Sequence, residues 1–245
     1  VRVRDNVLVP LCRLLPSVRT VRVEFRQVVD RWGFDRDCWG RGEYYIGLKN
    51  ILVALRVGVR PLRYRTDIRR HSCDKTITFT LREAYHHPLR NSQTEEWVKA
   101  AAVLGSRGFN VIIVRDTARA LEPLPGNVNY LNINVHVDRF DCASILTMRA
   151  QLYHHAVLNV GICNGPMWMS IFMDAPTLML RPTTNEAGGC YDDAFYAQMG
   201  LPRGSQLPAS PPHQRLCWQE DTCENIVRAV ESMLLNIDAC KEHIS

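Results

Sequence analysis

The feature that most constrains the fold is an alternation of short apolar runs with helical segments, which begins at Thr76 and continues to the end of the chain. Residues 109–114 (FNVIIV) are nearly all apolar, which is typical of a strand buried on both faces of a parallel sheet. Further strands are expected at residues 76–81, 158–162, 177–180 and 215–218, with a weaker candidate at 129–137. Strands that alternate with helices predict a doubly wound parallel sheet of the α/β class with right-handed crossovers.

The helices between these strands are predicted from capping residues and apolar stripes. Residues 92–95 read Ser-Gln-Thr-Glu, a capping-box pattern, so a helix is expected to start there and to end before Gly108. Its apolar stripe consists of Trp97, Ala101 and Leu104. Other helices are expected at residues 142–156, 166–173 and 191–199. The proline-rich residues 201–213 are expected to form a surface loop or a lid.

The last helix is predicted to follow residue 222. Either Asp221 or Thr222 caps it. Its apolar face consists of Ile226, Val230, Met233 and Ile237.

The chain length indicates one α/β domain with an appended piece. Its 245 residues are 46% hydrophobic, and we place the main domain at residues 76–245. Residues 1–75 are interpreted as a smaller amino-terminal α/β part that is partial or reduced, with a strand at 20–25 and a helix at 44–57.

The amino-terminal part is strongly basic. Residues 1–75 hold 17 Lys and Arg against 8 Asp and Glu, whereas the remainder of the chain is acidic, and the net charge is +5. An anionic substrate, a peripheral contact with an anionic membrane surface or a solvated arginine-rich face would each account for this charge. No nucleic-acid-binding motif accompanies the arginines, so no nucleic-acid partner is expected.

The cysteines and histidines do not predict a metal site. The nine cysteines are scattered singly without a C-x-x-C pair, which favours reduced thiols in a cytoplasmic protein. His86 with His87, and His154 with His155, are adjacent pairs, and adjacent residues on a helix point in different directions. We expect no metal and no cofactor. No apolar run reaches 18 residues and no secretory signal opens the sequence, which favours a cytoplasmic location.

The loop after the strand at 158–162 carries a candidate phosphate-binding turn. Ligands of doubly wound sheets bind at the carboxyl ends of the strands. Asn164, Gly165 and Pro166 follow this strand, with Gly165 in a tight turn and Pro166 at the first helical position. The free N–H groups of such a helix start favour a phosphate, although an ordinary strand-to-helix turn would look the same.

The loop after the strand at 76–81 carries the candidate cations. Arg82 leaves the carboxyl end of that strand, and Arg90, Asn91 and Ser92 precede the next helix. An arginine at this edge can bind a diphosphate with two parallel hydrogen bonds. The alternative for either arginine is a surface ion pair.

Residues 160–176 read VGICNGPMWMSIFMDAP, and residues 177–184 read TLMLRPTT. This stretch resembles the carboxyl-domain motif of the bacterial heptosyltransferases, which runs roughly V-G-x-D-T-G-x-x-H-L-A-A-A-L-x-x-P, an apolar strand and G-P-T. The segment 77–114 is similar to the family's preceding strand, basic loop, helix and strand, so the resemblance covers about residues 76–235. Four positions differ, because Cys163, Asn164, Trp168 and Arg181 stand at the family's Asp, Thr, His and Gly.

The resemblance implies a Rossmann-like domain of the GT-B type that binds a nucleotide-diphosphate sugar. It further implies an enzyme, a glycosyltransferase that acts without a metal on a glycan, lipid-linked or protein acceptor in glycan biosynthesis. Thr184 and Glu186 would lie near the donor, since a Glu in such a loop of GT-B enzymes and of the similar nucleotide-sugar 2-epimerases grips the ribose hydroxyls. Cys163 and Trp168 are interpreted as packing residues.

Other readings of this resemblance stay open. The family's general base comes from its amino-terminal domain, whose matching motif is not visible in residues 1–75, and Asp30, Asp35 and Asp37 are candidates for the role there. A nucleotide-sugar 2-epimerase is one alternative function. A binding protein that kept the GT-B fold and lost catalysis is another.

Overall fold

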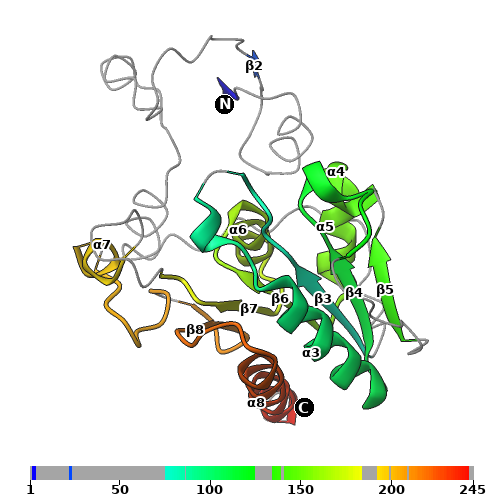
Figure 1. Cartoon of the computed structure of the whole chain (residues 1–245). Coiled ribbons are helices and arrows are strands. Elements are labelled where there is room, and N and C mark those ends of the chain that lie inside the picture. The colour runs from blue at the N-terminus through cyan, green and yellow to red at the C-terminus, as the bar shows by residue number, and fades with distance from the viewer. Residues whose placement is uncertain are drawn as a thin grey trace.

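A six-stranded parallel sheet forms the centre of the described part of the chain (Figure 1). The computed structural model describes residues 2–3, 22–23, 75–85, 87–124, 134–138, 141–183, 192–198, 200–208 and 210–242. The strands are β3 (Thr76–Thr80), β4 (Asn110–Val114), β5 (Val135–Asp138), β6 (Leu158–Ile162), β7 (Thr177–Leu180) and β8 (Gln214–Cys217). Their spatial order is β5-β4-β3-β6-β7-β8, and every neighbouring pair is parallel. This is the Rossmann order. The chain starts with β3 in the middle of the sheet, adds β4 and β5 on one side, and then adds β6, β7 and β8 on the other side.

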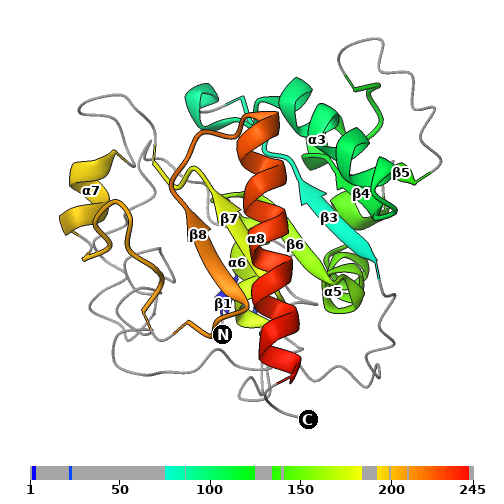
Figure 2. The same ribbon diagram turned by 90° about the horizontal axis from the view of Figure 1, so that it is seen from below.

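Helices cover both faces of the sheet, as the alternating pattern predicts (Figures 1 and 2). The helices α3 (Thr94–Ser106) and α8 (Cys223–Glu242) lie side by side on one face. The helices α5 (Leu146–His155) and α6 (Gly165–Phe172) lie on the other face. The remaining helices are short: η3 (Pro88–Arg90), η4 (Thr117–Arg119), α4 (Asp141–Ser144) and α7 (Asp193–Gln198).

The core lies where apolar periodicity placed it. All residues of β3, β6 and β7 are buried. The predicted face of α8 is buried at all four positions, and so is the stripe of α3. The Trp97 ring stands edge-on to Phe79 with ring centroids 5.0 Å apart, which joins α3 to the central strand.

Two of the predicted helix features are wrong. The helix expected at 142–156 is interrupted at Ile145, whose backbone is extended. The Arg149 guanidinium donates to the carbonyl oxygens of Cys142 (2.5 Å) and Ala143 (3.2 Å), so a side chain ends α4 there. The capping box at 92–95 does not form, because Ser92 Oγ accepts from the Arg82 amide at 2.9 Å instead.

The proline-rich segment covers the edge strand β8. Leu201 and Leu207 are buried in an apolar cluster. Gln206 Nε2 donates to Leu216 O at 2.9 Å, and Leu216 N donates to Gln206 Oε1 at 2.8 Å. The Trp218 indole donates to Ser205 O at 2.7 Å. The surface-loop interpretation holds for the exposed tip at residues 202–204.

Little of the amino-terminal part belongs to the described residues. Two short strands, β1 (Arg2–Val3) and β2 (Arg22–Val23), pair in parallel, and β2 falls within the strand expected at 20–25. The helix expected at 44–57 and the three candidate carboxylates lie outside the described residues. Among the helices of the described part, none is long and apolar enough to cross a membrane.

Candidate functional site

The strand order places a switch point between β3 and β6, where the chain turns from building one half of the sheet to the other. Ligands of such sheets bind outside the carboxyl ends of the strands at this point. The loops that follow these two strands carry the candidate cations and the candidate phosphate turn. Arg90, at the end of η3, reaches across the switch point and donates from Nη2 to Cys163 O at 3.0 Å. The structure therefore brings Arg90 to Cys163, which is 73 residues further along the chain and directly precedes Asn164 and Gly165.

Close packing beneath this point explains one glycine of the VGICNG sequence. A Cβ added to Gly161 of β6 would lie 2.8 Å from Thr80 O and 2.7 Å from Met167 Sδ. Such distances are shorter than real Cβ contacts, so only glycine lets α6 pack this closely over the junction of β3 and β6. Gly161 thereby sets the position of the α6 amino terminus at the switch point.

The start of α6 differs from the predicted tight turn. Gly165 is the first helical residue and is not among the described glycines with positive φ. Asn164 is the N-cap, and its Oδ1 accepts from Met167 N at 3.0 Å. Pro166 has no N–H group. In the first turn of α6, the exposed Gly165 amide is the N–H group for which the described residues provide no acceptor. The helix start therefore offers an anion one backbone N–H group, which is fewer than the sequence predicted.

Three other predicted site residues hold the loop itself together. Arg82 is 6% exposed and donates from Nη1 to His87 O (3.0 Å) and Asn91 Oδ1 (2.5 Å). The Asn91 side chain also pairs with both backbone polar groups of Ala84, at 3.1 and 2.9 Å. Ser92 exchanges hydrogen bonds with the Arg82 backbone. Arg82, Asn91 and Ser92 therefore shape the loop that presents Arg90.

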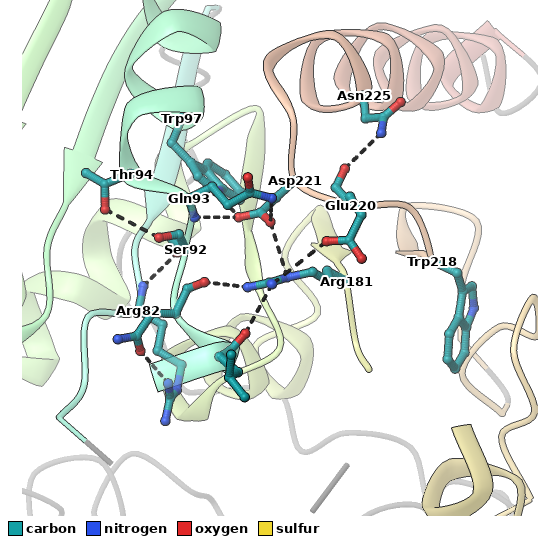
Figure 3. A network of polar contacts seen from close by, with 12 residues as sticks. Arg82, Ser92, Gln93, Thr94, Trp97, Arg181, Trp218, Glu220, Asp221 and Asn225 are labelled. Carbon is teal, nitrogen blue, oxygen red and sulfur yellow. Dashed lines mark hydrogen bonds and ion pairs between the residues drawn. The ribbon is translucent and has the colours of Figure 1, made fainter. Parts of the chain in front are cut away.

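A buried ionic cluster, missed in the sequence, lies directly behind this loop (Figure 3). Asp221 is fully buried, forms an ion pair with Arg181 Nε at 3.2 Å and accepts a hydrogen bond from the Trp97 indole at 2.7 Å. It also accepts from the backbone and side-chain nitrogens of Gln93, at 2.9 and 3.0 Å. Arg181 Nη1 lies 3.9 Å from Glu220 Oε2. Both acids follow β8 and Arg181 follows β7, and this placement of opposite charges after neighbouring strands was the available signal.

The amino termini of α3 and α8 cap one another. Asp221, expected as a possible cap of the last helix, binds the start of α3 through Gln93 N. In return, Glu96 Oε2 of α3 accepts from Cys223 N at the start of α8, at 2.8 Å. Thr222 Oγ1 accepts from Asn225 N at 3.3 Å and is the local cap of α8. A carboxylate at a helix amino terminus is favourable because it meets free N–H groups and the positive end of the helix dipole.

Cys163 and Trp168 occupy packing positions, as the sequence interpretation held. Cys163 is 5% exposed, and its Sγ lies 3.5 Å from Tyr196 Oη. Burial raises the pKa of the Cys163 thiol, which favours the protonated and less reactive form near neutral pH. Trp168 is half-buried against the same apolar cluster as Cys163.

A second buried ion pair lies at the carboxyl ends of β3 and β4. Arg115 donates to Glu83 through Nε (2.9 Å) and Nη2 (2.5 Å), and the two side chains are 1% and 7% exposed. Arg115 Nη1 also donates to Glu122 O and Pro123 O. This bidentate pair fixes the start of the loop that carries Arg82 and Arg90.

The remaining predicted site residues, Thr184 and Glu186, lie outside the described residues. Within the described residues, no group of three or more His, Cys, Asp or Glu side chains is placed to hold a metal ion.

Comparison with known proteins finds similarity among solved structures. No family model matches the chain, and no curated protein matches it. ADP-heptose LPS heptosyltransferase II of E. coli is 13% identical with a TM-score of 0.48, over 80% of this chain and 54% of that one. E. coli heptosyltransferase WaaC with ADP is 14% identical with a TM-score of 0.46, over 68% and 46%. The family 9 glycosyl transferase from Veillonella parvula DSM 2008 is 12% identical with a TM-score of 0.43, over 76% and 51%.

The chain is similar to these solved structures at low identity. It spans about half the length of these solved structures. The similarity concerns the Rossmann-like fold.

Proposed function

We propose that this chain binds the diphosphate of a nucleotide sugar at the switch point and serves as the donor-binding half of a glycosyltransferase-like protein. The observation that carries the proposal is the position of Arg90, which spans from the loop after β3 to the end of β6 at 3.0 Å from Cys163 O. This is the place where a Rossmann-ordered sheet binds its ligand.

The chemistry of the site suits a diphosphate. The Arg90 guanidinium offers positive charge and a planar set of N–H donors that match phosphate oxygens. The exposed Gly165 amide adds one backbone donor at the positive end of the α6 dipole. In sugar transfer, the same donors would stabilise the negative charge that builds up on the departing nucleoside diphosphate.

The wider assignment follows the resemblance and is part of the same proposal. Thr184 and Glu186 would contact the nucleoside, with Glu186 on the ribose hydroxyls. Transfer would proceed without a metal or a cofactor, in the cytoplasm, to a glycan, lipid-linked or protein acceptor. The basic residues 1–75 would contact an anionic membrane surface at the periphery.

A non-catalytic binding role is the second candidate, and the ion pairs at the carboxyl edge favour it. Glu83 pairs with Arg115, and Glu220 and Asp221 pair with Arg181. A carboxylate that is paired with an arginine is already engaged by that side chain and is less available to a substrate hydroxyl. We therefore propose that a base for sugar transfer, where transfer occurs, is not one of these three acids. Release of free nucleotide with an epimerised sugar in the absence of an acceptor would instead identify a 2-epimerase.

Calorimetric titration of the full chain with ADP, GDP, UDP and their sugar conjugates tests the proposal. We expect at least one nucleoside diphosphate to bind, and Arg90→Ala to weaken it about 10- to 100-fold, the equivalent of losing one charge-assisted hydrogen bond. Arg215→Ala is the matched control, because Arg215 is exposed at the amino-terminal edge of the sheet, where β8 begins. Absence of binding to all of these ligands, or equal affinities for both variants, would contradict the proposal.

A further inference from the structure

Arg181 has a backbone conformation that arginine rarely adopts. It follows β7 directly, and its φ of 42° lies in the left-handed region that favours glycine. Its backbone is nevertheless held in line with the sheet, since Arg181 N donates to Cys217 O at 2.9 Å. A bulky residue persists in such a conformation only where its surroundings fix it. The contacts of the Arg181 side chain supply such surroundings.

The Arg181 side chain is 12% exposed and joins two partners that lie on either side of it (Figure 3). On one side, Nε lies 3.2 Å from Asp221 Oδ1, and Asp221 is itself locked by Gln93 and Trp97 at the start of α3. On the other side, Nη1 donates to Leu89 O at 3.2 Å and Nη2 donates to Asn91 O. The guanidinium thus ties the turn at residues 88–91 to the rigid framework of the sheet and α3.

The carbonyl groups that Arg181 binds flank Arg90 in the sequence. The turn is also held from its amino-terminal side, where Arg82 Nη1 donates to the carbonyl of His87, a second residue with left-handed backbone (φ 53°). Two arginines therefore grip the carbonyl oxygens of residues 87, 89 and 91. With its neighbours fixed on both sides, Arg90 extends toward Cys163 across the switch point.

We propose that Arg181, oriented by Asp221, is a positioning residue that fixes the turn at residues 88–91 and thereby holds Arg90 at the switch point. This inference names a residue behind the site and rests on the proposed function only where nucleotide affinity is concerned. The ordering of the turn by Arg181 is a property of the ligand-free chain.

The first test is hydrogen exchange of the full chain without any nucleotide, in the wild type, Arg181→Lys and Arg181→Gly. A lysine keeps the charge but has one nitrogen in place of three, so it cannot bind Asp221, Leu89 O and Asn91 O together. Arg181→Gly removes the same contacts, and glycine adopts the left-handed backbone conformation without strain. It therefore serves as a second variant that should remain folded. We expect the amides of Arg90 and Asn91, which donate to His87 O and Pro88 O, to exchange at least about ten-fold faster in both variants.

A local effect is the expected result. Amides of β4 and α6 keep their wild-type protection, and Arg228→Lys, in an exposed ion pair on α8, leaves the turn unchanged. Unchanged exchange of the Arg90 and Asn91 amides in Arg181→Lys and Arg181→Gly would overturn the proposal. A uniform rise in exchange throughout the sheet would also overturn it, because Arg181 would then support only the global fold.

The second test is a double-mutant cycle with the nucleoside diphosphate that binds best. If Arg181 acts through Arg90, Arg181→Lys alone weakens binding of the nucleoside diphosphate. The double variant Arg181→Lys/Arg90→Ala then binds no more weakly than Arg90→Ala alone. Additive losses would overturn the positioning role. If the wild type binds no nucleotide, the proposed function fails, and the exchange experiment alone decides the role of Arg181.

Discussion

At the scale of single residues, the carboxyl edge of the sheet shows that an arginine at a strand end has more than one use. Arg82, Arg90, Arg115 and Arg181 all lie at this edge, and Arg90 is the one that donates to the end of β6 from the loop after β3. Arg82 and Arg181 bind backbone carbonyls of the same loop, and Arg115 is paired with Glu83. A guanidinium spreads its N–H donors over three nitrogens in a fixed plane and can reach carbonyls that lie apart, whereas an ammonium offers all its donors from one atom.

Cys142 gives a residue-scale prediction about thiol reactivity. Partial burial and then the nearby Asp138 carboxylate raise the pKa of the Cys142 thiol from 9.0 to about 11. The thiolate is the reactive form, so alkylation of Cys142 by iodoacetamide at pH 8 should be about 100-fold slower in the folded chain than in urea. Peptide mass spectrometry at this residue measures both rates.

The raised pKa of Cys142 also determines the direction in which the stability of the fold changes with pH. A folded-state pKa above the unfolded value stabilises the fold below pH 9, and this contribution is lost as the pH rises toward 11. Asp138→Asn removes the second cause and should speed alkylation in the folded chain, whereas equal rates in folded and unfolded chains would contradict the assignment.

At the scale of elements, the start of α6 depends on one side chain. Asn164 Oδ1 accepts from Met167 N, and Asn164→Ala removes this cap. The loss should lower the free energy of unfolding by about 1 kcal/mol, measured by urea denaturation. Asn236→Ala, at an exposed position inside α8, should instead be neutral or slightly stabilising because alanine has the higher helix propensity. A loss of similar size in both variants would show that Asn164 is not acting as a cap.

The elements that could be predicted from the sequence are those that depend on a local pattern of apolar residues. The strands at 158–162 and 177–180 and the buried face of α8 were predictable because burial on both faces, or on one stripe, leaves a continuous or periodic apolar pattern. The break at Ile145 was not, since it is imposed by the Arg149 side chain from the following helix.

The candidate site divides in the same way. The loops after β3 and β6 were predictable as the ligand edge once parallel strands were recognised. The charges of Arg181 and Asp221 after consecutive strands were a signal for their pairing, but the contact of Asp221 with the start of α3 depends on the spatial order of the elements, which the apolar pattern does not contain.

At the scale of the whole molecule, the helices α3 and α8 hold each other at their amino termini. Glu96 accepts from Lys99 Nζ at 2.6 Å and from Cys223 N at 2.8 Å, and these two contacts, the first above all, lower the pKa of its carboxyl group below 4.5. The link joins the start of α3 to the start of α8, 127 residues further along the chain. It therefore connects the beginning of the domain to its end.

The contacts of Glu96 with Lys99 and Cys223 predict that the stability of the fold depends on pH in the acidic range. A lowered folded-state pKa stabilises the fold above pH 4.5, and this contribution is lost as the pH falls below it. Glu96→Gln should therefore lower the melting temperature at pH 6, and the difference from the wild type should vanish toward pH 3. Glu95→Gln, at an exposed position in the same helical turn, is the control and should show no such convergence. A Glu96→Gln difference that is constant with pH would contradict the ionic origin of the link.

The contact of Gln206 with β8 has a consequence for how copies of this molecule behave toward one another. An open edge strand offers backbone N–H and C=O groups on which a strand of another chain can grow. At Leu216 both groups are occupied by one glutamine side chain, which imitates the peptide group of a neighbouring strand. The sheet is thereby terminated from within at this edge, and self-association by strand addition would first have to displace Gln206.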